Sequence, residues 1–226
     1  FKDRLETLGF EPLLDEPTEI SQQRISTINA MTTLAHDPDS IATAHALAGR
    51  EAVDPTSVDP NLAALLVNIN AQFGDASVFQ QHVNIYQARK SNSAPPQAVN
   101  RYLNSFTSFR APELVNQTLS LLDEGIAPRE ALGPTLGRLL SARHSQVAAW
   151  EYFKTNWLTI KEMGMGGSGL IEYAGQFPPA MRADVVEFYE NNAKGEADMA
   201  YAQALETMDL LAEFQARIQD DLVKWL

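Results

Sequence analysis

The residues of this chain that could do chemistry are few and scattered. A zinc peptidase holds its metal with two histidines one helical turn apart and uses a glutamate between them to activate the bound water. No His-Glu-x-x-His occurs, and the histidines are dispersed at His36, His45, His82 and His144. Metal ligands must converge closely, so these four are expected to be surface or capping residues. The absence of cysteine also excludes disulfides, thiolate nucleophiles and cysteine-ligated zinc.

One glycine-rich segment has the composition of a phosphate loop. In the run Gly164-Met165-Gly166-Gly167-Ser168-Gly169, clustered glycines would let backbone amides approach an anion. However, the segment lacks the lysine of a Walker loop and follows a predicted helix rather than a strand. It is therefore interpreted as a helix stop followed by a turn. Ser168 opens no strand-turn-helix pattern, so no catalytic triad is assigned to it.

The charge of the chain limits its partners. It has 17 Lys and Arg against 29 Asp and Glu, a formal net charge of −12, which repels a polyanion and argues against nucleic acid. Acidic residues form no continuous tail, so pairs such as Asp123-Glu124 and Asp220-Asp221 are interpreted as solvated charge. No apolar stretch approaches the roughly 20 residues of a membrane helix, and no membrane partner is expected. The compartment, cytoplasmic or exported, stays open.

The elements that would position these residues are helices. Proline and glycine lie between apolar-periodic segments rather than inside them, which is typical of a helix array. Asp37-Pro38, Asp59-Pro60 and Ala111-Pro112 each place proline at a first helical position, and the two aspartates are predicted caps. Lys2 to Thr7 also has helical character. The pattern predicts helices over 18–35, 38–49, 59–73, 76–90, 95–108, 111–124, 128–141, 144–163, 168–176, 181–192 and 195–225.

Two apolar stripes predict the packing of the later helices. The first stripe recurs at three- and four-residue steps and is predicted to be core rather than a ligand cage: Trp150, Phe153, Trp157 and Ile160. The second lies on the last helix and predicts that this helix docks on its neighbours: Tyr201, Leu205, Met208, Leu211, Ile218, Leu222 and Trp225.

Short helices joined by turns cannot bury their apolar faces singly, so they must stack in pairs. The spacing of the proline-marked starts is unequal and no tandem-repeat consensus is present. The sequence therefore predicts an all-α fold: an irregular HEAT- or armadillo-like right-handed superhelix of antiparallel helix pairs. No long linker interrupts the pattern, and residues 1–226 are predicted to form a single helical-repeat domain.

One motif resembles a known family. The run from Ala148 to Trp157, Ala-Ala-Trp-Glu-Tyr-Phe-Lys-Thr-Asn-Trp, is similar to the Ala-Trp-x-Phe-x-x-x-Asn-Trp signature in the C-terminal domain of aminopeptidase N and endoplasmic-reticulum aminopeptidase-type enzymes. Looser similarities span the chain: Leu8-Gly9-Phe10 with Pro12, His36-Asp37-Pro38, and Val223-Lys224-Trp225-Leu226. Ser145-Gln146-Val147 departs from the pattern, since the family often has Gly-Arg before the tryptophan motif.

The resemblance implies that the chain is the non-catalytic C-terminal fragment of a zinc aminopeptidase. It would close a peptide chamber over the active site and gate access, with the N-terminal catalytic domains and the peptide substrate as its partners. Zinc would belong to the parent enzyme, and no catalytic, cofactor or metal residue is expected here. The resemblance also implies that a basic side chain on the inner surface holds the C-terminal carboxylate of the peptide, and Arg110 and Arg138, near helix ends in the middle of the array, are the candidates.

Two other functions stay open at this point. The chain could be a free-standing helical-repeat adaptor that binds a partner protein on its concave face. It could also be an enzyme of unrecognised type, which a buried pair of titratable groups converging in a pocket would indicate.

Overall fold

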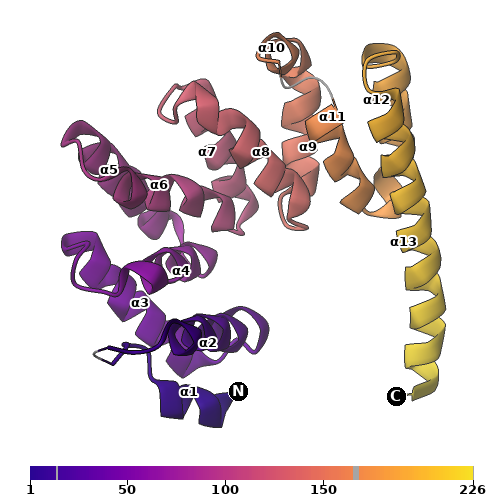
Figure 1. Ribbon diagram of the computed structural model, residues 1–226. Coiled ribbons are helices and arrows are strands. Elements are labelled where there is room, and N and C mark those ends of the chain that lie inside the picture. Colours follow the sequence, from indigo (N-terminus) through magenta and orange to yellow (C-terminus); the bar gives the residue numbers. More distant parts are fainter. Residues whose placement is uncertain (14, 165–167, 226) are drawn as a thin grey trace. The chain divides into compact units, whose positions relative to one another are not determined.

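A computed structural model describes residues 1–13, 15–164 and 168–225, without the side chains of Ser168, Asp220 and Trp225. Every regular element within these ranges is a helix, which confirms the all-α prediction (Figure 1). None of the helices in the described ranges combines the length and the apolar character needed to cross a bilayer.

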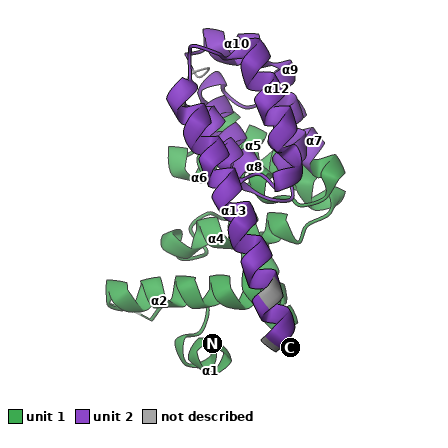
Figure 2. Ribbon diagram, turned by 90° about the vertical axis from the view of Figure 1, so that its right-hand side faces the viewer, with its two compact units in different colours: residues 1–114 green, residues 115–226 purple. Residues whose placement is uncertain are grey.

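Contacts within the chain divide it into two compact units, residues 1–114 and 115–226 (Figure 2). The boundary falls within α7 (Pro112–Asp123). The predictions of a single domain and of a right-handed superhelix stay predictions.

The first unit consists of α-helices of seven to 16 residues with two shorter helical segments. Along the chain they are α1 (Lys2–Leu8), α2 (Thr18–Asn29), the π-helical η1 (Ala30–Leu34), α3 (Pro38–Val53), α4 (Pro60–Gln72), α5 (Ala76–Ser91), α6 (Pro96–Ser105) and the 3₁₀ turn η2 (Phe106–Ser108). Helix α4 contacts both α2 and α6, while α3 packs on α4 and α5 packs on α6. Part of the apolar core between these helices consists of Ile28, Leu47, Leu62, Leu66 and Ile69.

The second unit contains several short and irregular elements together with one long last helix of 28 residues. They are η3 (Arg129–Ala131), α8 (Leu132–Ser141), α9 (Gln146–Thr155), α10 (Trp157–Glu162), α11 (Ser168–Ile171), η4 (Glu172–Gln176), η5 (Pro179–Met181), α12 (Arg182–Asn192) and α13 (Asp198–Trp225). The predicted aromatic stripe forms its core, and Trp150, Phe153, Trp157 and Ile160 are all buried. Trp150 and Phe153 stack on each other with ring centroids 5.2 Å apart, and Phe188 of α12 packs against both.

Aspartate caps start three of the helices, as the Asp-Pro pattern predicts for the first two. The carboxylate of Asp37 accepts a hydrogen bond from the Ser40 amide at 2.9 Å, and that of Asp59 accepts one from the Asn61 amide at 2.8 Å. Asp75 caps α5 in the same way, although no proline follows it. Each cap contributes about 1 kcal/mol by satisfying an amide that the helix itself leaves free.

Five of the predicted helices are not continuous α-helix: 18–35, 95–108, 128–141, 144–163 and 168–176. In 18–35 and 144–163, a side-chain hydrogen bond lies where the helix changes. Within 18–35, the hydroxyl of Thr32 donates to the Ile28 carbonyl, and the backbone changes to the wider π-helical turn of η1. The single helix predicted over 144–163 is wrong, because it breaks at Asn156. There the side-chain amide of Asn156 donates to the Tyr152 carbonyl at 3.0 Å, a local competition with the helix that asparagine favours.

Helix α13 is half buried and half exposed. Its first half packs on η4 and α11 through Ala200, Ala204 and Met208. Gly175 permits this close approach, since a Cβ at that position would lie 3.1 Å from Thr207. The prediction that the stripe docks on neighbouring helices is confirmed as far as Met208. It is wrong for the later residues, because Leu211 and Leu222 are exposed.

Candidate functional site

The two arginines predicted to hold a peptide carboxylate lie in different units. Arg110 is exposed in the connection that precedes α7, within the first unit. Arg138 is exposed in the last turn of α8, within the second unit, and it interacts with a neighbouring group. Neither residue lines a pocket described below. The assignment of Arg110 and Arg138 to substrate binding stays a prediction.

A pocket of about 260 Å³ lies in the second unit, where the chain turns from α7 into α8. The turn is made by Gly125, whose φ of 68° suits glycine, and Pro128 then starts η3. The opposite wall comes from α9 and α10. The lining residues are Leu122, Asp123, Gly125, Ala127, Pro128, Arg129, Leu132, Tyr152, Asn156, Thr159, Ile160 and Met163.

This pocket has an apolar interior and a polar rim. The hydroxyl of Tyr152 donates to Asp123 Oδ1 at 2.6 Å; burial and this hydrogen bond raise the pKa of Tyr152 well above its usual value. Asp123 is therefore a structural acceptor as well as a solvated charge. Arg129 is exposed at the rim, and Glu130 and Glu162 line an adjoining pocket with it.

A guanidinium beside an apolar pocket is suited to a ligand that carries a carboxylate next to an apolar group. Arg129 was missed in the sequence, where it carries no motif. Its position in the sequence does offer a signal: Arg129 lies in the short connection between Gly125 and α8, as the first residue of η3. Binding residues concentrate on such connections.

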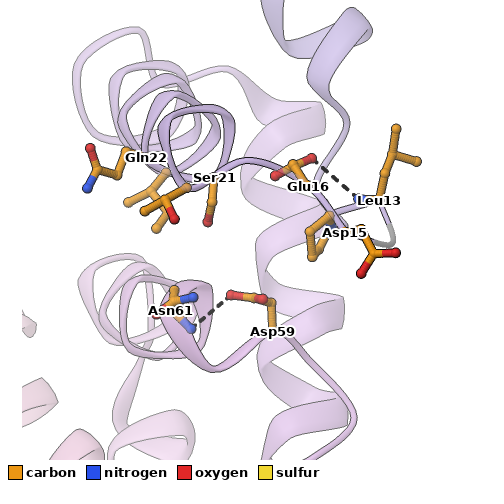
Figure 3. A pocket seen from close by; sticks show the side chains of 10 residues that line it. Leu13, Asp15, Glu16, Ser21, Gln22, Asp59 and Asn61 are labelled. Carbon is orange, nitrogen blue, oxygen red and sulfur yellow. Dashed lines mark hydrogen bonds between the residues drawn. The ribbon is translucent and has the colours of Figure 1, made fainter.

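The larger pocket, of about 530 Å³, lies in the first unit between α2 and α4 (Figure 3). Uncharged polar side chains face it from both helices, with Ser21 and Gln22 on α2 and Asn61 on α4. Two of its three acidic residues, Glu16 and Asp59, already have partners within the chain. Glu16 pairs with the buried Arg24, whose hydrogen bond lowers the pKa of Glu16, and Asp59 caps α4. This pocket therefore offers hydrogen bonds more than net charge.

A buried ion cluster lies inside the first unit. The carboxylate of Glu51 on α3 has no exposed surface and accepts hydrogen bonds from Arg89 at 2.8 Å, from the hydroxyl of Tyr102 at 2.6 Å, and from Arg101. Burial and the hydrogen bond to Glu51 raise the pKa of Tyr102 far above its usual value. None of the four residues lines a pocket described here, so the cluster ties α3, α5 and α6 together rather than facing a ligand.

The histidine prediction is wrong for His82, which lies in the core. Its Nδ1 is 2.8 Å from the Ser105 hydroxyl, a spacing that a nucleophile and its base could have. The Ser105 hydroxyl donates to the Tyr102 carbonyl at 2.8 Å, however, so its oxygen accepts from His82 Nδ1–H. Histidine is therefore the donor, and the hydroxyl is not activated. Desolvation lowers the pKa of His82 to about 4.

The remaining predicted features carry no assembled site. Gly164 ends the helical segment with φ of 75°, as a helix stop requires, whereas Met165, Gly166, Gly167 and the side chain of Ser168 lie outside the described residues. Among the described side chains, no three of the His, Asp and Glu type come together in a way that would hold a metal ion. The described residues thus do not fit a zinc centre.

Comparison with known proteins agrees with the motif around Trp150. The profile of the family described as ERAP1-like C-terminal domain matches residues 1–210. Aminopeptidase 2 of Candida albicans is 26% identical over 232 residues, which covers 99% of this chain and 25% of that protein. Probable aminopeptidase 2 of Sulfurisphaera tokodaii is 25% identical over 159 residues, which covers 69% of this chain and 20% of that protein. The chain thus spans about a quarter or less of the length of these relatives.

Proposed function

The chain belongs to the family of ERAP1-like C-terminal domains, and from this membership we propose that it is the non-catalytic C-terminal part of a zinc aminopeptidase. The match over residues 1–210 carries the proposal, and the aminopeptidase names of the two relatives support it. In this role the chain closes a peptide chamber over an active site that lies in the preceding part of a longer polypeptide. Zinc and the catalytic residues belong to that part.

The fold supports a chamber-forming role rather than a catalytic one. An array of short helices presents many side chains over a wide surface, and movement of such a part relative to a metal domain can gate access. Open pockets lined by carboxamides, hydroxyls and one arginine offer hydrogen bonds to a peptide. Basic groups at the chamber wall would hold the carboxylate end of the substrate, for which Arg110, Arg138 and Arg129 are the proposed residues.

Reading the coding sequence upstream of Phe1 tests the first half of the proposal. We expect Gly-x-Met-Glu-Asn followed by His-Glu-x-x-His and a later glutamate in the same open reading frame. The longer polypeptide, loaded with zinc, should hydrolyse aminoacyl amides. The chain of residues 1–226 alone should neither hydrolyse them nor bind stoichiometric zinc, and hydrolysis by the pure chain would contradict the proposal. An open reading frame without the zinc signature would favour the adaptor.

The chamber role is tested by comparing substrates of different length. Arg129→Gln, Arg110→Gln and Arg138→Gln are made separately in the longer polypeptide. Substitution of an arginine that holds a distant peptide end should raise KM for long peptides by about tenfold, equivalent to about 1.4 kcal/mol. The same substitution should leave the hydrolysis of single aminoacyl amides unchanged. If none of the three variants separates the two substrate types, these arginines do not hold the substrate.

A further inference from the structure

The exposed half of α13 is the largest run of uncovered apolar side chains on one described helix. Leu211 is 38% exposed, Phe214 is 48% exposed and Leu222 is 52% exposed. In Figures 1 and 2 this half of the helix extends past the other helices of its own unit. Single exposed leucines are ordinary, but a contiguous apolar stripe marks an interaction surface.

The stripe is continuous with an interface that is already formed. Met208, Leu211, Ile218 and Leu222 follow steps of three, seven and four residues, so they share one face of the helix. Met208 is buried in the core of the second unit, and the same face of α13 becomes exposed one turn later, at Leu211.

The opposite face carries the exposed charged residues Glu206, Glu213 and Lys224, which water can solvate. Leu210 and Val223 are exposed singly outside the stripe. The contiguous apolar surface that a partner would cover is therefore the stripe.

A second copy of the chain is a poor cover for this stripe. From Leu211 to Trp225 the helix offers about two heptads, fewer than the three to four over which a coiled-coil pattern is normally sustained. Paired helices of this length would also bury less than the roughly 1,600 Å² of a standard interface. Two copies with a formal charge of −12 each repel one another as well.

These limits on size and charge do not apply to a surface on the same polypeptide. Covalent connection supplies an effective concentration in the millimolar range, so a short stripe can dock that would not hold two separate molecules together. The chain matches 25% of the length of the Candida albicans relative, which leaves most of such a polypeptide to provide the surface. The matched family profile ends at residue 210, one residue before the stripe becomes exposed at Leu211.

We propose that the apolar stripe Leu211, Phe214, Ile218 and Leu222 of α13 docks in an apolar groove on the catalytic part of the longer polypeptide. The inference rests on the proposed function, because it requires that catalytic part. In this proposal α13 has two roles. Its first half belongs to the core of the second unit, and its second half attaches this C-terminal part to the rest of the enzyme.

Hydrogen exchange compares the longer polypeptide with the chain of residues 1–226. Amides of 211–224 should exchange at least about tenfold more slowly in the longer polypeptide, equivalent to about 1.4 kcal/mol of added protection. Amides of 200–208, which are buried in the second unit, should be protected in both and serve as the internal reference. Equal exchange of 211–224 in the two proteins would overturn the proposal.

Two triple variants of the longer polypeptide separate docking from helix stability. Leu211→Gln, Phe214→Gln and Leu222→Gln together should abolish the extra protection. Glu206→Gln, Glu213→Gln and Lys224→Gln, which place the same number of glutamines on the polar face, should retain it. Loss of protection in both triples, or in neither, would contradict docking through the apolar face.

Two other surfaces could cover the stripe, and each would give a distinct result. If residues 1–226 form a dimer by light scattering and the apolar-face triple variant makes them monomeric, a second copy covers the stripe and the proposal is wrong. If 211–224 is already protected in monomeric 1–226, this chain covers its own stripe and the proposal is equally wrong. Exchange needs no catalysis, so a longer polypeptide without peptidase activity would refute the proposed function and still report on docking.

Discussion

At the residue scale, the first unit buries polar groups in two opposite ways. His82 is desolvated and has only neutral partners, so it gives up its charge, and its pKa falls to about 4. Glu51 is equally buried but faces two guanidinium groups and a hydroxyl, so its charge is compensated. Each arrangement makes stability depend on one side chain in a way that a variant can measure.

His82 predicts a loss of stability in acid. Its pKa in the folded chain is about 4, below the ordinary value of 6.5, so between these values the unfolded chain binds more protons. The free energy of unfolding should therefore be highest above pH 6.5 and fall as the pH falls towards 4, by up to about 3 kcal/mol from this group. Urea unfolding at a series of pH values measures the slope.

The control for this slope is a glutamine variant. His82→Gln can still donate to Ser105 but does not titrate, so it should remove the contribution. The same slope in His82→Gln as in the unmodified chain would show that other groups cause the acid sensitivity.

Glu51→Gln tests the ion cluster. The change leaves the guanidinium groups of Arg89 and Arg101 buried without their counter-charge, which should lower the free energy of unfolding by about 3–5 kcal/mol. The matched control is Glu11→Gln, which removes a carboxylate from Arg50 in an exposed pair and should cost less than about 1 kcal/mol. Denaturant titration of the two variants gives both numbers. Similar costs would mean that Glu51 is solvated in solution.

At the element scale, local hydrogen bonds decide where the helices change form and tertiary contacts decide how close they lie. Proline and aspartate set the starts of α3 and α4, whereas Thr32 and Asn156 divert backbone carbonyls within longer apolar-periodic segments. Glycine has a separate role inside a helix. Gly137 on α8 allows the ring of Tyr173 on η4 to lie against the helix backbone.

Two glycine-to-alanine changes separate helix propensity from packing. Gly49→Ala in α3 meets nothing within 4 Å, so it should stabilise the chain by about 0.5–1 kcal/mol through propensity alone. Gly137→Ala gains the same propensity, but its Cβ would lie 3.0 Å from the Tyr173 ring, and the strain should make it destabilising by about 1 kcal/mol. Thermal unfolding of both variants gives the comparison. Stabilisation by Gly137→Ala would show that Tyr173 moves freely.

At the scale of the whole molecule, charge is the dominant property that the sequence imposes. A formal charge of −12 on 226 residues is left when every Lys and Arg is counted against an acidic residue, so repulsion between like charges opposes the folded state. The buried pairs Glu16–Arg24 and Glu51–Arg89 are shielded from salt, whereas most other pairs are exposed.

Salt is therefore expected to stabilise the chain. Raising the ionic strength from about 0.01 M to about 0.15 M shortens the screening length from about 30 Å to about 8 Å and weakens the net repulsion. A gain of about 1 kcal/mol would raise Tm by about 2–4 °C at this size. Scanning calorimetry at both salt concentrations measures it. A fall in Tm would mean that exposed pairs such as Lys194–Glu190 outweigh the repulsion.

The sequence by itself determined the helical class, most helix positions and the family, because these depend on periodicity, caps and local motifs. Proline after Asp37 and Asp59 suits the first position of the helix that follows it, and the spacing of Trp150 and Phe153 puts two rings on one face of α9. Such features involve residues within a few positions of each other, so they can be recognised without knowledge of the tertiary structure.

Tertiary structure decided which polar groups lose contact with water and which apolar groups keep it. His82 and Leu211 illustrate both cases: the histidine is buried against Tyr102, Ser105 and Phe109, which follow it in sequence by 20 residues or more, and the leucine is exposed although its stripe predicts burial. Arg129 lies at the rim of a pocket because the α7–α8 turn packs near α9 and α10, whose residues form the opposite wall. Burial depends on neighbours that are distant in sequence, and a periodic pattern marks which face is apolar without saying what covers it.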